Sequence, residues 1–147
     1  MSHATPSQTV GPYYAIGLTR EPQNVLEEGG IELSGTLYDG AGDPIPDGMI
    51  EVLDAAGSRW GRCGTKELQG GFRFVVPRDC DVLEAFVFAR GMLWHERTRI
   101  YLRAVDDEVL AGLEPARRAT LLAAASGDGL RFDIRMQGEG ATVFFEH

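Results

Sequence analysis

The chain has 147 residues, enough for one domain with a substantial hydrophobic core, and its formal net charge is −8. This negative charge argues against nucleic acid and anionic membranes as partners. No apolar run approaches the roughly 20 residues that span a bilayer, and the start lacks the basic and apolar regions of a secretory signal. We therefore expect a soluble, cytoplasmic protein.

The cysteines and basic residues give two further expectations. Cys63 and Cys80 are not arranged as CxxC, which leaves a disulfide and a structural zinc site both weakly supported. We expect two free, partly buried thiols. Lys66 is the only lysine among the 14 basic residues. Arginine suits planar, bidentate recognition of carboxylates, so interfaces and acidic ligands are of interest.

Residues 1–30 are predicted to form an extended arm ahead of a folded domain at 31–147. The arm is rich in conformationally restricted residues: Pro6 and Pro12 fix φ near about −65°. Gly11 permits backbone geometry that a side chain would forbid. One interpretation is a leader that packs on its own domain, and the other is a segment with a function of its own.

Alternation of apolar and polar residues between Gly and Pro turn signals predicts strands along the first part of the domain. In 31–38, the residues Ile31, Leu33 and Leu37 fall on one face. The run 85–89 is apolar throughout, as expected of a central strand. The strands expected here are 31–38, 49–53, 72–76, 85–89 and 98–102.

The pattern becomes helical near 105–125, where Pro115 suits a first helical turn and Gly127 a stop. Strand alternation then returns. Many short strands with one helical excursion predict an all-β fold, an antiparallel β-sandwich. The elements expected in this part are helices at 106–111 and 115–125 and strands at 130–136 and 142–145.

Catalytic motifs are scarce. The three histidines, His3, His95 and His147, form neither HxH nor HExxH. Only His95 is placed to serve Ser–His–Asp catalysis, and no GxSxG elbow presents a serine. Neither a P-loop nor a GxGxxG motif is present. The chain's own residues therefore predict a poor enzyme.

Two groups of charged residues have unusual positions. Arg90 closes the apolar strand at 85–89, where the strand reaches the rim of the sandwich. It is either a solvated strand-end arginine or one that reaches a partner or an anionic ligand. Arg131, Asp133 and Arg135 alternate along one strand face. Such a ladder more often pairs charges across strands than forms a site, so we expect a structural role.

Three segments resemble the intradiol ring-cleaving dioxygenases. They are TPSQTVGPYYAIGL in the arm, FARG followed by HERTRIYL, and the C-terminal RFDIRMQGEGATVFFEH. They occur in the family's order from residue 5 to 147 and resemble the alpha type of chain, which pairs with a homologous beta chain. Between them, the sequence looks shorter than the family pattern, mainly in 55–70 and 77–83.

The resemblance implies a β-sandwich subunit of a larger oligomer. It implies that two tyrosines and two histidines of the beta chain hold a non-haem Fe(III), and that this chain has no working metal site. Where the beta type has H-x-H, this sequence has Val82-Leu83-Glu84. The implied reaction is the cleavage of protocatechuate by O2 to 3-carboxy-cis,cis-muconate.

The resemblance further implies that the arm and the arginine of FARG reach the beta chain's active site. The residues carried over by motif are Thr9, Gly11, Pro12, Tyr13 and Arg90. Gly11 and Pro12 let the backbone approach a flat aromatic acid, and Tyr13 offers a ring and a hydroxyl. Arg90 pairs either with the substrate carboxylate or with the arm.

Two other functions fit the sequence. A stand-alone β-sandwich binding module without a catalytic role has the same strands and few histidines, because a fold does not specify a function. A homomeric intradiol enzyme that holds iron through Glu84, His95 and Tyr101 is the second alternative, although strand-borne ligands normally have closer spacing.

Overall fold

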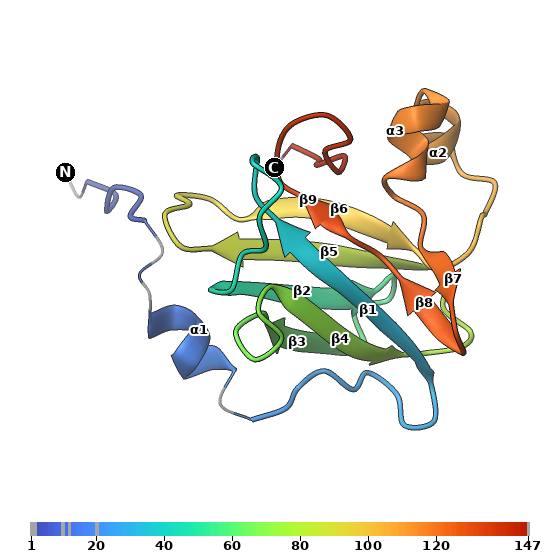
Figure 1. Cartoon of the computed structure of the whole chain (residues 1–147), viewed down its shortest axis with the longest axis horizontal. Helices are drawn as coiled ribbons and strands as arrows, with labels where there is room; N and C mark the ends of the chain where they lie inside the picture. Colours follow the sequence, from blue (N-terminus) through green and yellow to red (C-terminus); the bar gives the residue numbers. More distant parts are fainter. Residues whose placement is uncertain (1–2, 10, 12, 20, 147) are drawn as a thin grey trace.

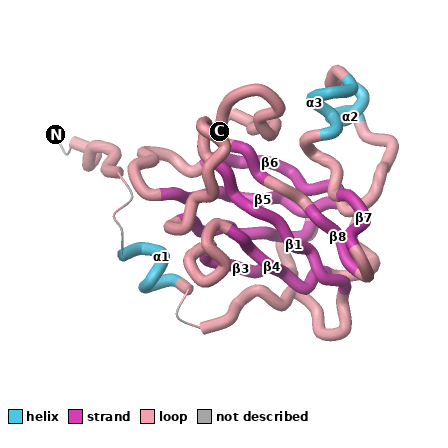
Figure 2. Tube along the Cα trace, in the orientation of Figure 1, coloured by secondary structure: helices cyan, strands magenta, loops and turns pink. Residues whose placement is uncertain are grey.

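The computed structural model describes residues 3–9, 11, 13–19 and 21–146. Strands fill the centre of the molecule, and short helices lie at its periphery (Figure 2). In chain order, the elements are α1 (Tyr13–Leu18), β1 (Ile31–Tyr38), β2 (Gly48–Asp54), β3 (Trp60–Gly64), β4 (Gly71–Val76), β5 (Val82–Ala89), β6 (Glu96–Tyr101), α2 (Glu108–Ala111), α3 (Pro115–Ala119), β7 (Ala124–Ser126), β8 (Gly129–Arg131) and β9 (Ile134–Arg135).

Two sheets pack face to face as a β-sandwich, which confirms the predicted fold class (Figure 1). One sheet has the order β3-β2-β5-β6 and is antiparallel throughout. The other has the order β4-β1-β8-β7, with β9 also on β1, and it is mixed because β8 and β9 run parallel to β1. Parallel pairing requires a long crossover. Here the chain forms the strands of the antiparallel sheet and then α2 and α3 before β8 and β9 return to β1.

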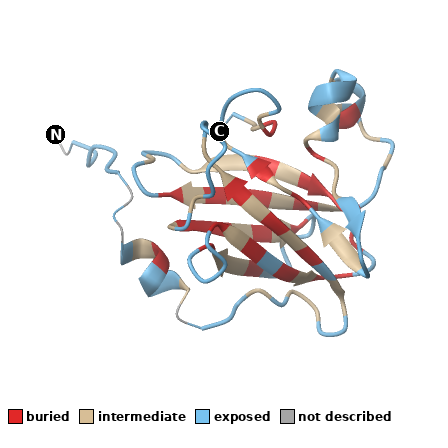
Figure 3. Ribbon diagram, in the orientation of Figure 1, coloured by how far each residue is buried: buried red, intermediate tan, exposed pale blue. Residues whose placement is uncertain are grey.

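The core follows the alternation that the sequence predicts. In β1, Leu33 and Leu37 are fully buried, and in β5 the buried positions also alternate (Figure 3). β5 lies between β2 and β6, as predicted for the apolar run at 85–89. A second, smaller cluster lies beside α2 and α3; its buried members are Tyr101, Leu110, Leu121 and Val143.

The predicted helix at 115–125 is too long. α3 ends at Ala119, because the next residues pair with the end of β6: Tyr101 N–H donates to the Leu121 carbonyl and Ala123 N–H to the Tyr101 carbonyl. The predicted strand at 130–136 is interrupted. There the Asp133 carboxylate accepts the Thr36 N–H at 3.0 Å, so a side chain replaces one backbone rung between β8 and β9.

The predicted strand at 142–145 is also wrong. Its backbone N–H groups go to different partners: Thr142 donates to the Arg135 carbonyl, Val143 to the Thr120 hydroxyl and Phe145 to the Arg97 carbonyl. Only the bridge between Phe145 and Arg97 has strand character. The segment therefore covers the edge of β6 without forming a regular ladder.

The N-terminal segment differs from a wholly extended arm, since it contains the helix α1. Beyond the helix, the chain runs between the edge strands of the two sheets. Arg62 N–H of β3 donates to the Gln23 carbonyl, and Val75 N–H of β4 donates to the Asn24 carbonyl. The division into an arm at 1–30 and a sandwich at 31–147 stays a prediction. Within the part of the chain that the structure describes, no helix has the length and apolarity needed to cross a bilayer.

Candidate functional site

The helix α1 docks on one end of the sandwich through Tyr14. The Tyr14 hydroxyl lies 3.0 Å from the Asp47 carbonyl and 2.9 Å from the Phe88 carbonyl, and its single O–H is shared between these two acceptors. Burial, with a contribution from the Asp47 charge, raises the pKa of Tyr14 well above its usual range. The hydroxyl therefore stays protonated and keeps its role as a donor.

The predicted arm residues lie on the solvent side of this attachment. Thr9 and Gly11 are exposed, and 78% of Tyr13 is accessible. Gly11 is linked to the helix, because its carbonyl accepts the Tyr14 N–H at 3.4 Å. Pro12 lies outside the described residues. The docked helix thus presents the Tyr13 ring outward.

Arg90 stands in the turn that follows β5, at the rim where the sequence placed it. Its Nε lies 3.5 Å from the Asp47 carboxylate, and 62% of its side chain is exposed. Asp47 therefore contacts both groups of interest, since its carbonyl accepts from Tyr14 and its carboxylate pairs with Arg90. The structure brings the arm helix and Arg90 to the same end of the molecule.

Large apolar side chains are exposed at this end, which we call the arm-end surface. They lie on α1 and on the turn between β5 and β6, on the side of the molecule opposite α2 and α3 (Figure 1). Exposed apolar side chains that gather in one region are candidates for an interaction surface. Its members are Tyr13, Ile16, Leu18, Leu93 and Trp94.

The three residues considered as alternative iron ligands, Glu84, His95 and Tyr101, have protein partners in this structure. Both carboxylate oxygens of Glu84 accept from arginines, Oε2 from Arg97 at 3.0 Å and Oε1 from Arg99 at 2.7 Å. The Tyr101 hydroxyl donates to Asp107 at 2.8 Å. Among residues 3–9, 11, 13–19 and 21–146, no three His, Cys, Asp or Glu side chains form a group able to hold a metal ion. The alternative ligand set of Glu84, His95 and Tyr101 is already engaged with protein partners.

His95 and the cysteines also have structural surroundings. The His95 ring packs 5.4 Å from the ring of Phe86 and 5.3 Å from that of Phe88. Cys63 and Cys80 are free thiols, as predicted, and both are at least partly buried. Burial raises the pKa of each thiol. A thiol with a raised pKa is a weak nucleophile, so neither cysteine is suited to catalysis.

The charge ladder near the end of the chain makes contacts within the fold, although its ion pair joins two residues of the same segment and not charges of facing strands. Arg131 forms an ion pair with Asp133 at 2.7 Å and a hydrogen bond with the Thr36 hydroxyl at 3.1 Å. The guanidinium of Arg135 lies 4.7 Å above the ring of Tyr38. These three charged residues line a depression of about 370 Å³ beside β7 and β8. The depression is walled by residues already engaged in structural contacts.

Sequence reasoning missed the two residues that organise the arm end, Tyr14 and Asp47. Tyr13 and Tyr14 are consecutive, and consecutive residues of a helix point in different directions. A helix prediction for 13–18 would therefore have separated an inward tyrosine from an outward one. Asp47 gave no signal, because its role depends on its backbone carbonyl as much as on its carboxylate.

Comparison with known proteins gives close relatives along the whole chain. It is 34% identical to the protocatechuate 3,4-dioxygenase alpha chain of Pseudomonas putida, over 97% of this chain and 96% of the relative. It is 32% identical to the alpha chain of the same name from Burkholderia cepacia, with the same coverage. These alignments extend over 195 and 193 positions, more than the 147 residues here, so the relatives contain internal segments that this chain lacks.

Solved structures agree on the fold. The dioxygenase domain of a dioxygenase carbohydrate-binding protein fusion from a Streptomyces species has a TM-score of 0.50 at 19% identity, covering 90% of this chain and 96% of that one. Hydroxyquinol 1,2-dioxygenase from Pseudomonas putida has a TM-score of 0.51 at 14% identity, covering 91% and 66%. No protein-family profile matches the chain. On the two curated relatives, the chain belongs to the family of protocatechuate 3,4-dioxygenase alpha chains, within the intradiol ring-cleaving dioxygenases.

Proposed function

We propose that the chain is the alpha, non-iron-binding subunit of an enzyme that cleaves protocatechuate with O2 to 3-carboxy-cis,cis-muconate in aromatic compound degradation. The names of the relatives support this reaction. The observation that carries the proposal is the docked arm, which presents Tyr13 outward at the same rim as Arg90. An exposed aromatic ring and an exposed cation on one rim are together able to contact an aromatic acid.

In this function, a homologous beta chain completes the site against the arm-end surface. The exposed apolar residues of α1 and of the β5–β6 turn suit burial against a partner. In the proposal, the beta chain holds the Fe(III); the engagement of Glu84 in this chain by Arg97 and Arg99 supports that assignment. The assembled hetero-oligomer is expected to work in the cytoplasm.

Five residues of this chain line the pocket in the proposal, namely Thr9, Gly11, Pro12, Tyr13 and Arg90. Protocatechuate is a flat aromatic acid, so it needs an apolar wall and a cation. The Tyr13 ring supplies a flat face and a hydroxyl. The Arg90 side chain is mostly exposed, and its contact with Asp47 runs through Nε at 3.5 Å, so its other N–H groups are outside that ion pair and able to pair with a carboxylate.

The proposal is tested by expressing the chain alone, the beta chain alone and both together, and by measuring iron content and protocatechuate-dependent O2 uptake. Iron and activity in the combined assembly, with no iron in this chain alone, are the expected result. Iron in the isolated chain would overturn the assignment of the metal. Equal activity of a beta-chain assembly without this chain would reduce it to a binding module.

A variant pair then tests the site. Arg90→Ala is expected to raise KM for protocatechuate by about ten-fold or more, because a charge-assisted contact with the substrate is lost. Arg73→Ala is the matched control: Arg73 is similarly exposed and pairs with Glu32 of β1 at 3.4 Å, but it lies on β4 and not in the turn after β5 that carries Arg90. Equal effects of the two substitutions on KM would contradict the role of Arg90.

A further inference from the structure

The attachment of α1 is specific at both ends of the helix. At its start, the Tyr14 hydroxyl reaches the carbonyls of Asp47 and Phe88 on the strand side. At its end, the Leu18 carbonyl accepts from Arg62 at 3.3 Å, and Arg62 is itself paired with Glu51. A cation beside the last carbonyls of a helix is favourable. A helix of 6 residues is not stable by itself, so these contacts fix its position.

The next residue along, Thr19, closes the helix against β3. Its hydroxyl and its N–H both donate to the Ala15 carbonyl, at 2.5 and 2.9 Å. Its side chain lies directly over Gly64, where an added Cβ would stand 3.1 Å from the Thr19 hydroxyl. Ala15 is the buried residue of α1. The face that carries Tyr14 and Ala15 is therefore fixed, and the face that carries Tyr13 points away from the sandwich.

We propose that Tyr14 is a positioning residue, which sets the location of Tyr13 relative to Arg90 by holding α1 on the carbonyls of Asp47 and Phe88. This inference rests on the proposed function. Asp47 couples the two groups, because the residue that receives the Tyr14 hydroxyl also carries the carboxylate that pairs with Arg90. The Tyr14 side chain lies on the side of α1 that faces the sandwich, so it acts only through the residues whose position it fixes, Tyr13 and Arg90.

Tyr14→Phe removes the hydroxyl and keeps the ring, so it tests the hydrogen bonding of Tyr14 to the Asp47 and Phe88 carbonyls with little change in packing. In the assembly with the beta chain, we expect KM for protocatechuate to rise about five-fold, as for one lost hydrogen bond, with kcat changed less than about two-fold. Hydrogen exchange of the amides at 14–19, measured in the isolated chain, is expected to become faster. Iron content should stay unchanged.

Tyr101→Phe is the matched control. The Tyr101 hydroxyl also donates to an acceptor of the protein, the Asp107 carboxylate at 2.8 Å, but it lies in the cluster beside α2 and α3. We expect it to leave exchange in α1 and KM for protocatechuate unchanged. A rise in KM equal to that of Tyr14→Phe would overturn the positioning role, because general loss of stability would then explain both.

The outcomes separate this inference from the proposed function. If Tyr14→Phe leaves amide hydrogen exchange in α1 unchanged, the claim that the Tyr14 hydroxyl holds the helix in place is overturned, whatever the activity. Faster exchange with unchanged KM, while Tyr13→Ala raises KM, overturns the positioning role alone. If Tyr13→Ala and Arg90→Ala also leave KM unchanged, the proposed pocket has failed and the positioning role falls with it.

Discussion

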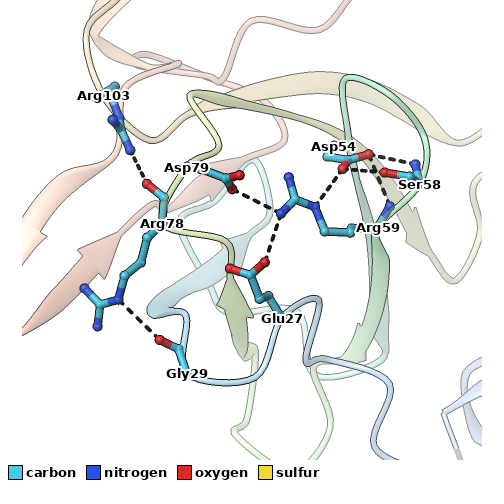
Figure 4. A network of polar contacts seen from close by, with 8 residues as sticks. All are labelled: Glu27, Gly29, Asp54, Ser58, Arg59, Arg78, Asp79 and Arg103. Atoms are coloured by element: carbon cyan, nitrogen blue, oxygen red, sulfur yellow. Dashed lines mark hydrogen bonds and ion pairs between the residues drawn. The ribbon is translucent and has the colours of Figure 1, made fainter.

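The strongest prediction for pH dependence concerns Asp54, at the end of β2. Its carboxylate is 5% exposed and accepts from the backbone and side chain of Ser58 and of Arg59 (Figure 4). The Arg59 guanidinium also binds Glu27 at 3.0 Å and Asp79 at 3.1 Å. The network ties the N-terminal segment to the β2–β3 turn. Its hydrogen bonds, chiefly from Arg59, lower the pKa of Asp54 from 3.8 to about 2.

The size of the effect follows from this shift. Each pKa unit corresponds to about 1.36 kcal/mol, so the full shift would be worth roughly 2.4 kcal/mol. The network opens to water through Arg59 and Asp79, whose side chains are 30% and 74% exposed, so screening reduces the contribution to about 1–2 kcal/mol. Because the folded pKa is the lower one, this stability is complete above 3.8 and is lost as the pH falls towards about 2.

Asp54→Asn removes the charge and keeps the shape of the side chain. We expect the free energy of unfolding in urea to fall by about 1–2 kcal/mol near neutral pH. The difference between the two proteins should shrink as the pH falls through the window from 3.8 to about 2. Asp79→Asn, at the exposed end of the network, is the control and should cost less than about 0.5 kcal/mol. A difference for Asp54→Asn that is the same at both ends of the window would refute the reasoning.

Three further predictions test the fold around the site. In Gly35→Ala, the new Cβ would lie 1.8 Å from the Phe132 carbonyl oxygen, so we expect a loss of about 3 kcal/mol in urea unfolding; a neutral result would contradict that close approach. Thr65→Val leaves the buried N–H of Gly48 without its acceptor, the Thr65 hydroxyl at 2.8 Å, and should lower the free energy of unfolding by about 2 kcal/mol. Thr65→Ser keeps the hydroxyl and should lower it much less; equal losses would rule out the hydrogen bond as the cause. In Gly17→Ala, the new Cβ on α1 has no neighbour within 4 Å, and alanine favours a helix over glycine by up to about 1 kcal/mol. We therefore expect amide hydrogen exchange in α1 to slow by about three-fold; faster exchange would mean that the helix is misplaced.

The strands of the core were predictable because burial on one face imposes a strict period. The strand 31–38 was predicted with the observed bounds, and 85–89 was correctly expected at the centre of a sheet. β3 was not predicted, since two of its five residues, Gly61 and Gly64, carry no side chain to show a face. Its strand conformation comes from pairing with β2 along its whole length, a tertiary effect that local propensity does not contain.

The arm end, where we propose the site, was less predictable, because its organisation depends on backbone carbonyls. Tyr13 and Arg90 were named as site residues through the family resemblance, because the sequence pattern alone left open whether Arg90 is a solvated strand-end arginine or one that reaches a partner or an anionic ligand. The contacts that join them run from a side-chain hydroxyl to the carbonyls of Asp47 and Phe88, and any residue type provides a carbonyl. Such contacts leave no trace in composition or periodicity.

The arrangement of charges supports the proposal that this chain contributes to the pocket through its rim. On the outer face of β5 and β6, Glu84 is held by Arg97 and Arg99, so that surface is neutralised by guanidinium groups of the chain itself. Arg90 differs from them: its ion pair is longer, at 3.5 Å, and its side chain is more exposed than those of Arg97 and Arg99. An arginine so weakly held keeps its capacity to bind a carboxylate from outside. The charged residues of this sheet therefore pair with one another. Arg90, in the turn after β5, remains available as a cation beside the arm.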